Sequence, residues 1–202
     1  MCACDPDAPA AHALPMPPAF ARVWITDRRG CARPVPDQVE RLAAEGAVDA
    51  VVLREKNLDA AAYERLACAT AAACARAGIA FVIHTHVDVA RRLGVAAVHL
   101  PLPELRALGR PAGFACVGTN VHALDEVAEA QRLGADVLVA SPVFAPSCKL
   151  AATAQGLPFL RAAVERARVP VLALGGIDDE NELLIRESGA AGACRMADYT
   201  HR

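Results

Sequence analysis

The chain has 202 residues, of which 54% are hydrophobic and only 4% aromatic, so its core is expected to consist of Ala, Val, Leu and Ile. The net charge of −2 comes from 21 basic and 23 acidic residues that are mixed along the chain, which excludes a basic nucleic-acid face or a polybasic membrane patch. There is no membrane-length apolar run and no signal-peptide pattern, and the eight cysteines are scattered, so we expect a cytoplasmic protein.

Residues 1–19 differ in composition from the rest of the chain. They are rich in Ala, Pro and Asp and have no apolar period, which predicts a flexible leader. Further along, one unit recurs: a helical stretch ends, a glycine follows, and a short apolar run begins a few residues later. Examples are "RLAAEGAVDAVVLR" (41–54) and "QRLGADVLVASP" (131–142). We therefore expect a leader at 1–19 and a single domain at 20–202.

Short apolar runs are expected to form the strands. They are continuous rather than alternating, as in parallel strands that are covered on both faces, and they occupy residues 23–26, 50–53, 79–83, 97–100, 115–118, 136–140, 170–174 and 192–195. Helical stretches fit between them, for example at 36–45, 59–77, 86–93, 123–133, 157–167 and 179–188.

This alternation predicts a compact (β/α)₈ TIM barrel. A doubly wound sheet is the competing fold, but it needs a glycine-rich phosphate loop after the first strand, where only "DRRG" (27–30) follows. The chain stops at Arg202, so we expect the last helix to be truncated. In a barrel the active site lies at the carboxyl ends of the strands, which makes the residues there the candidates for function.

The end of the second predicted strand carries two cations. Arg54 and Lys56 are two residues apart, so they share one side of an extended chain while Glu55 faces the other. Together the two cations suit a phosphate or a carboxylate. The alternative is a surface ion pair with Glu55.

The third predicted strand ends in "IHTH" (83–86). His84 and His86 would project to one side, and His99 on the next strand could join them if the registers match. That arrangement keeps a zinc hydrolase open as an alternative, but no carboxylate stands in a suitable place. We therefore predict no metal site, and we assign His84 to the substrate and His86 to the cap of the following helix.

His122 follows the fifth predicted strand, close to the polar Asn120. An imidazole at a strand end can shuttle protons near neutral pH, and the alternative is a histidine that bonds to the start of the following helix. The segment "SPVFAPSCKL" (141–150) resembles a loop over the barrel mouth, from which Lys149 could reach an anionic substrate. A nucleophilic Cys148 beside Lys149 is a further alternative.

The loops after the last two strands predict a phosphate cradle. Gly175 and Gly176 precede an acidic helix start, and glycine lets a ligand approach backbone amides. The amides of Met196 and Ala197 would complete the cradle, and Arg195 could add positive charge. The alternative for the glycines is a tight turn without a ligand.

Together these strand-end residues resemble the thiamine phosphate synthase and thiazole tautomerase superfamily. The resemblance runs from "VWITDRR" (23–29) to "GAAGACRM" (189–196). It rests on motifs in the same order and spacing: "ITDRR", "LREKNL", "VDVARRLGVAAVHLP", "VHALDEVAEAQRLGADVLVASPVF", "CK" and "LALGGIDDEN". It implies a (β/α)₈ barrel, in agreement with the strand count.

The resemblance to the synthase branch implies a magnesium-dependent union of a pyrimidine diphosphate with a thiazole phosphate. Thr85 stands where that branch has a metal-binding aspartate, and "PLPE" (101–104) stands in place of the Gly-Gln-x-Asp that carries the second. Val52 replaces a glutamine that contacts the pyrimidine, and Asn120 replaces a serine. Because threonine is a poor Mg²⁺ ligand, a divergent synthase is the alternative and not the leading prediction.

The tautomerase branch lacks the same metal residues and shares "HLP" and "CK" with this chain. The resemblance implies isomerisation of a carboxythiazole phosphate to its aromatic tautomer, with His122 transferring the proton. It also implies a phosphate cradle at Gly176, Met196 and Ala197, and cations for the carboxylate drawn from Lys149, Arg54 and Lys56.

We therefore predict a metal-independent, thiazole tautomerase-like isomerase. It would need no cofactor, with magnesium required only for the synthase alternative, and its partner would be a small-molecule thiazole phosphate rather than nucleic acid or membrane. A homodimer is an option that the sequence leaves open. A non-catalytic, phosphate-binding or regulatory member of the superfamily is the third alternative, because Asp198 beside the cradle is unfavourable unless it points away.

Overall fold

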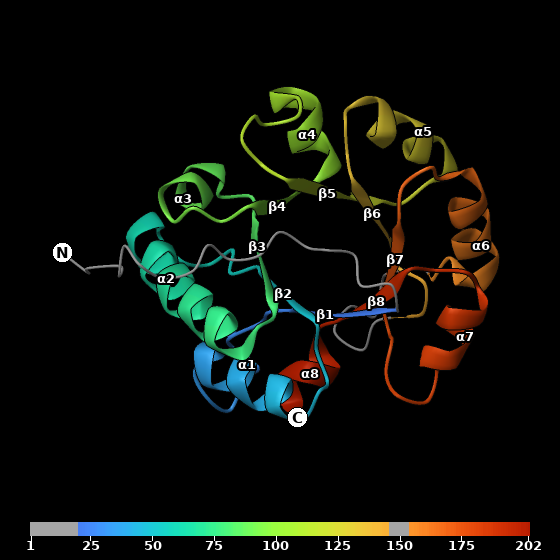
Figure 1. Ribbon diagram of the computed structural model, residues 1–202. Coiled ribbons are helices and arrows are strands. Elements are labelled where there is room, and N and C mark those ends of the chain that lie inside the picture. The colour runs from blue at the N-terminus through green and yellow to red at the C-terminus, as the bar shows by residue number, and fades with distance from the viewer. Residues whose placement is uncertain (1–19, 146–153) are drawn as a thin grey trace.

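The computed structural model describes residues 20–145 and 154–202, and within them eight parallel strands close into a barrel (Figure 1). Each strand pairs with its sequence neighbours, and β1 pairs with β8. The fold is therefore the predicted (β/α)₈ barrel. The strands are β1 (Ala21–Ile25), β2 (Ala50–Leu53), β3 (Ala80–His84), β4 (Ala97–Leu100), β5 (Cys116–Val121), β6 (Val137–Ala140), β7 (Val171–Leu174) and β8 (Gly192–Arg195).

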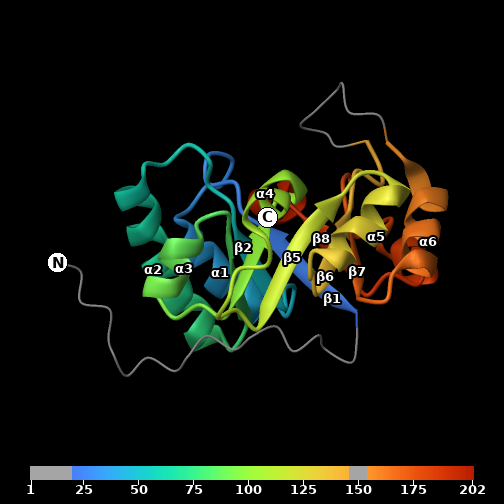
Figure 2. The same cartoon turned by 90° about the horizontal axis from the view of Figure 1, so that it is seen from above.

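Helices surround the barrel, and Figure 2 shows α1 to α3 on one side of the strands and α5 and α6 on the other. The helices are α1 (Val35–Ala44), α2 (Ala60–Ala77), α3 (Val87–Arg92), α4 (Leu102–Leu108), α5 (Leu124–Arg132), α6 (Gly156–Arg166), α7 (Glu182–Glu187) and α8 (Ala197–His201). Helix α4 is not among the helical stretches that the sequence predicts; it begins directly after Pro101 with a second proline in its first turn, a place where proline is tolerated. No described helix is long and apolar enough to cross a membrane.

The last helix, α8, has five residues, and side chains of neighbouring elements hold it in place. The Tyr199 hydroxyl donates to the Ala47 carbonyl at 2.7 Å, and the Gln38 amide donates to the Tyr199 carbonyl at 2.7 Å. The Trp24 indole donates to the Thr200 hydroxyl at 3.3 Å. These bonds fix α8 beside α1 and beneath the end of β8 (Figure 1).

The two faces of the strands carry different side chains, which explains where the cavity lies. Outward residues such as Trp24, Val51 and Phe81 are almost fully buried against the helices. Inward residues form a second cluster that combines branched side chains such as Val23, Val139 and Leu172 with small ones, namely Ala21, Ala50, Ala80, Ala97, Cys116 and Cys194. TIM barrels usually fill this interior with bulky branched residues, and here alanines and cysteines take several of those places, which leaves room below the carboxyl ends of the strands.

Candidate active site at the carboxyl ends of the strands

A cavity of about 940 Å³ opens at the carboxyl ends of the strands. Lys149 and Cys148 lie outside the described residues. The other predicted site residues all line this one cavity: Arg54, Lys56, His84, Asn120, His122, Gly175, Gly176, Met196 and Ala197. Residues from five separate strand ends therefore meet at one cavity, as expected for the carboxyl ends of the strands in a TIM barrel.

The end of β2 presents its two cations to the cavity and turns its carboxylate away. Glu55 is buried, accepts a hydrogen bond from the Thr26 hydroxyl at 2.7 Å, and pairs with Arg28 at 3.8 Å. Arg54 and Lys56 line the cavity, and within residues 20–145 and 154–202 neither forms an ion pair. The alternative of a surface ion pair with Glu55 is wrong, because Arg28 takes that position.

His84 and His99 stand side by side at the ends of β3 and β4. They are register partners, and their rings stack with centroids 5.6 Å apart. The His99 Nε2 nitrogen donates to the Asn120 side-chain oxygen at 2.7 Å. Burial, followed by the neighbouring charges of His99, Arg54 and Lys56, lowers the pKa of His84 to about 3. Burial also lowers the pKa of His99, so both rings are neutral at pH 7.

His86 does not accompany His84. Thr85 has a φ of +71°, which interrupts the extended chain. The His86 ring consequently packs against Tyr63 with 3.9 Å between centroids, and His86 is absent from the cavity lining. His86 is the N-cap residue of α3, as predicted, and it caps the helix through its backbone, because its side chain makes no capping hydrogen bond.

His122 extends the end of β5 and is held by the loop after β6. Its Nδ1 nitrogen lies 2.7 Å from the Ser141 carbonyl oxygen, which can only accept a hydrogen bond. Its backbone N–H donates to Glu126 at 2.6 Å, and the Gln155 amide donates to its carbonyl at 2.6 Å. Sequence reasoning missed Ser141 and Gln155 as supports of His122, since nothing in their local sequence marks them.

Packing against the loop after β6 is enough to explain the two glycines after β7. Gly175 and Gly176 have φ values of +112° and +60°, which favour glycine. A Cβ atom on Gly175 would lie 2.9 Å from Pro142, and one on Gly176 would lie 2.7 Å from the Ala145 carbonyl oxygen. The close approach of the loop after β6 therefore requires both glycines, and ligand access is not needed to explain them.

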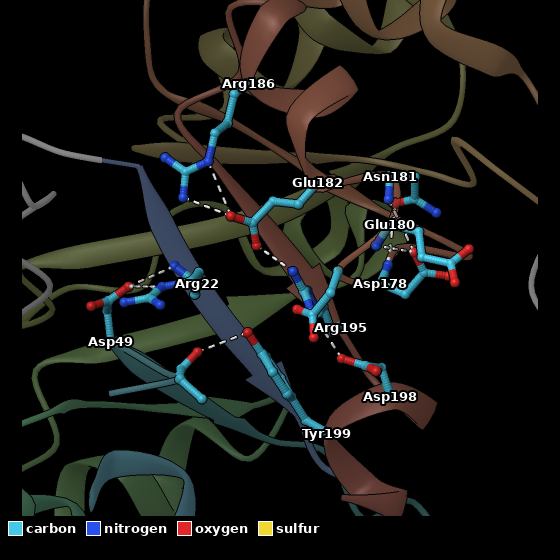
Figure 3. Close-up of polar contacts among 12 residues, drawn as sticks. Arg22, Asp49, Asp178, Glu180, Asn181, Glu182, Arg186, Arg195, Asp198 and Tyr199 are labelled. Carbon is cyan, nitrogen blue, oxygen red and sulfur yellow. Dashed lines mark hydrogen bonds and ion pairs between the residues drawn. The ribbon is translucent and has the colours of Figure 1, made fainter. Parts of the chain in front are cut away.

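Arg195 at the end of β8 is almost fully buried and is enclosed by carboxylates (Figure 3). It bonds to Asp179 at 2.6 Å, to Asp198 at 3.0 Å and to Glu182. Burial alone would lower the pKa of Arg195, but the hydrogen bonds to Asp179 and Asp198 outweigh it and raise this pKa above its usual value. The prediction that Arg195 adds positive charge for a phosphate is wrong, because the protein's own carboxylates pair with that charge.

Asp198, predicted to be unfavourable unless it points away, lines the cavity, but its carboxylate is paired with Arg195 and also lies 3.7 Å from Arg202. Asp178 on the preceding loop lines the cavity as well. The β7–β8 wall, which we define as Asp178, Arg195, Met196, Ala197 and Asp198, therefore has no uncommitted cation among the described residues.

The donor set at β3 and β4 does not fit a divalent metal ion. The Thr85 hydroxyl is directed at His84 Nδ1, 2.7 Å away, and Pro101 has no donor atom in its side chain. No group of three or more His, Cys, Asp or Glu residues suited to a metal occurs in residues 20–145 and 154–202. Mg²⁺ prefers carboxylates, and zinc needs three or four protein ligands, so these strand ends suit neither ion.

Comparisons with known proteins identify relatives of this chain and agree with the barrel fold. A family model described as thiamine monophosphate synthase matches residues 23–198. A thiamine-phosphate synthase of Syntrophomonas wolfei is 34% identical over 160 residues, which cover 76% of this chain and 75% of that protein. One of Shouchella clausii is 32% identical over 167 residues, covering 80% and 79%. The solved thiamine phosphate pyrophosphorylase of Pyrococcus furiosus superposes with a TM-score of 0.79 at 29% identity, covering 91% of this chain and 88% of that one.

Proposed function

The chain belongs to the thiamine monophosphate synthase family, and we propose that it isomerises a carboxythiazole phosphate to the aromatic tautomer without a metal ion. The observation that carries this proposal is that one cavity is lined both by His122 and by two cations that have no carboxylate partner among the described residues. His122 has one nitrogen tied to Ser141, and Arg54 and Lys56 face the same space without carboxylate partners among the described residues. A proton-transfer group and an anion anchor are what such an isomerisation requires.

His122 is the proposed proton shuttle. Its Nδ1–H is committed to the Ser141 carbonyl oxygen, which leaves the lone pair of the neutral ring on Nε2. Nε2 takes the proton from one carbon of the substrate and returns it to a second carbon as the double bonds rearrange. The ring is protonated only between the two steps, so neither an oxidant nor a co-substrate is needed.

The two anionic groups of the substrate are proposed to occupy different walls. Arg54 and Lys56 hold the carboxylate, since a free guanidinium and a free ammonium are strong partners for it. The backbone amides of Gly176, Met196 and Ala197 hold the phosphate, because amides can bind an anion without a cation. Lys149 is a third proposed cation for the carboxylate.

The test is aromatisation of the carboxythiazole phosphate, followed by absorbance in the presence of EDTA. Turnover is expected for the parent enzyme, and His122→Ala is expected to lower kcat by about 10²- to 10⁴-fold, the usual contribution of a general acid–base group. His86→Gln is the matched control, because His86 lies outside the cavity and should leave the rate unchanged. An unchanged rate in His122→Ala would rule out His122 as the shuttle.

A divergent thiamine phosphate synthase is the second candidate. The comparisons favour it over the isomerase, since the relatives reported above are described as synthases, whereas the donor set at β3 and β4 favours the isomerase. Formation of thiamine phosphate from the pyrimidine diphosphate, the thiazole phosphate and Mg²⁺ would establish the synthase. Tight thiazole phosphate binding with no turnover in either assay would instead indicate a binding protein.

A further inference from the structure

The chain makes a strained turn where β3 enters the cavity. Thr85 has a φ of +71°, and the His86 N–H donates across it to the His84 carbonyl at 2.8 Å. A turn closed in this way around a positive φ is the rare and strained form of the γ-turn. For a β-branched residue such as threonine, this backbone conformation is a marked outlier.

Glycine would adopt this backbone conformation without strain, so the presence of a threonine at position 85 requires an explanation from its side chain. The turn places Thr85 Oγ1 at 2.7 Å from His84 Nδ1. His84 is 7% exposed and lines the cavity, and its ring is confined by the stacked ring of His99. Strained residues of this kind cluster at functional sites, where the strain holds a working group in position.

The hydrogen bond to Thr85 decides which face of the His84 ring remains available. Nδ1 is the acceptor within reach of the Thr85 hydroxyl among the described residues. If that hydroxyl donates to Nδ1, the proton of the neutral ring must reside on Nε2. Nε2–H is then the only polar group of His84 left to meet a ligand.

We propose that Thr85 is a positioning residue that fixes the Nε2–H tautomer of His84, and that Nε2–H donates a hydrogen bond to the substrate carboxylate beside Arg54. This inference rests on the proposed function for the identity of the ligand. It adds a specificity element to the cavity: a neutral donor holds the carboxylate together with the cations, whereas a group without an acceptor oxygen would leave Nε2–H unpaired.

The surroundings of His84 keep the ring neutral, as the proposal requires. Arg54 and Lys56 approach it from the end of β2, His99 from β4 and His86 from its own chain segment. All four disfavour a further positive charge, and burial acts in the same direction. Acidification to pH 5 should therefore leave the His84 ring neutral.

The direct test is the ring ¹⁵N and ¹H spectrum of histidine-labelled protein, with the His84 signals assigned from a His84→Gln sample. The parent and Thr85→Ser are expected to show a single Nε2–H tautomer from pH 7 to pH 5. Thr85→Val, which keeps the branched side chain but removes the hydroxyl, should show a mixture of tautomers. An Nδ1–H tautomer in the parent, or an unchanged spectrum in Thr85→Val, would overturn the inference whether or not the protein turns over a thiazole.

The second test separates function from structure by comparing Thr85→Gly with Thr85→Ser. Glycine relieves the strain, so Thr85→Gly should melt no lower than the parent and up to about 3 °C higher. Its affinity for the carboxythiazole phosphate, measured by calorimetry, should nevertheless fall about 10-fold. Thr85→Ser should retain affinity to within about 3-fold. A Thr85→Gly protein that melts lower and binds as tightly would show that Thr85 is only structural.

His84 itself is tested by a pair of amides of different length. The Gln amide can reach the position of Nε2, whereas the shorter Asn amide reaches only that of Nδ1. His84→Gln is therefore expected to bind the carboxythiazole phosphate more tightly than His84→Asn by about 10-fold. The reverse order would contradict the inference, and isomerase turnover plays no part in either measurement.

Discussion

The two sides of the cavity use their cations in opposite ways. We define the β2–β4 wall as Arg54, Lys56, His84 and His99, in which the cations have no carboxylate partner among the described residues and the imidazoles are neutral. On the β7–β8 wall the buried Arg195 is surrounded by Asp179, Glu182 and Asp198 (Figure 3). A cation in a cavity wall is therefore not evidence of anion binding until its own partners are known.

The largest expected difference between the walls is in stability. Arg195→Met leaves Glu182 and Asp198 without their buried partner, which should lower the free energy of unfolding by about 3 kcal/mol. Arg54→Met removes a side chain with no ion pair and should change this free energy by less than about 0.5 kcal/mol. Urea unfolding of the two variants measures both values. If both variants lost the same free energy of unfolding, the ion pairs of Arg195 would not contribute to stability in the way proposed here.

The next effect is on ligand binding, where the roles of the walls are reversed. Arg54→Gln should weaken the binding of the carboxythiazole phosphate about 30-fold, because a charge-assisted hydrogen bond is lost. The same variant should bind the thiazole phosphate that lacks the carboxylate nearly as well as the parent does. Calorimetry with both ligands provides the comparison. An equal loss for the two would place the phosphate, rather than the carboxylate, at Arg54.

A smaller effect is expected on acidification and comes from the β2–β4 wall. The folded pKa of His84 is about 3 and its ordinary value is 6.5, so below pH 6.5 the unfolded chain takes up a proton that the native ring does not. Stability is therefore lost as the pH falls from 6.5 towards 3, by about 1 kcal/mol between pH 6.5 and 5.5 from this group. Urea unfolding at both pH values should show a smaller loss in His84→Gln. An identical loss would contradict the burial of a neutral His84.

The smallest expected effect concerns Asp198 on the β7–β8 wall. Asp198→Asn removes a negative charge beside the proposed phosphate amides, and exposed or half-exposed charges contribute less than about 1 kcal/mol. The affinity for the thiazole phosphate should rise about 3-fold by calorimetry. A weaker affinity would indicate that Asp198 supports the cradle through Arg195 and does not oppose the phosphate.

The barrel, and with it the gathering of the strand-end residues around one cavity, could be predicted from the sequence, because continuous apolar runs and the glycines after the helices are local signals. Gly78, for example, ends α2 in the left-handed conformation that the pattern predicts. The partners of Arg195 could not be predicted in this way, since Asp179 and Glu182 reach it from another strand–helix unit. The different directions of His84 and His86 could not be predicted either, because nothing in the sequence "IHTH" indicates that Thr85 has a positive φ.

The most direct test of the central claim is the rate at which the metal-free protein aromatises the carboxythiazole phosphate in EDTA, compared with its rate of thiamine phosphate formation in Mg²⁺. We predict turnover in the first reaction, lowered about 10²- to 10⁴-fold by His122→Ala, and none in the second. No aromatisation together with magnesium-dependent formation of thiamine phosphate would contradict the account and identify the protein as a synthase.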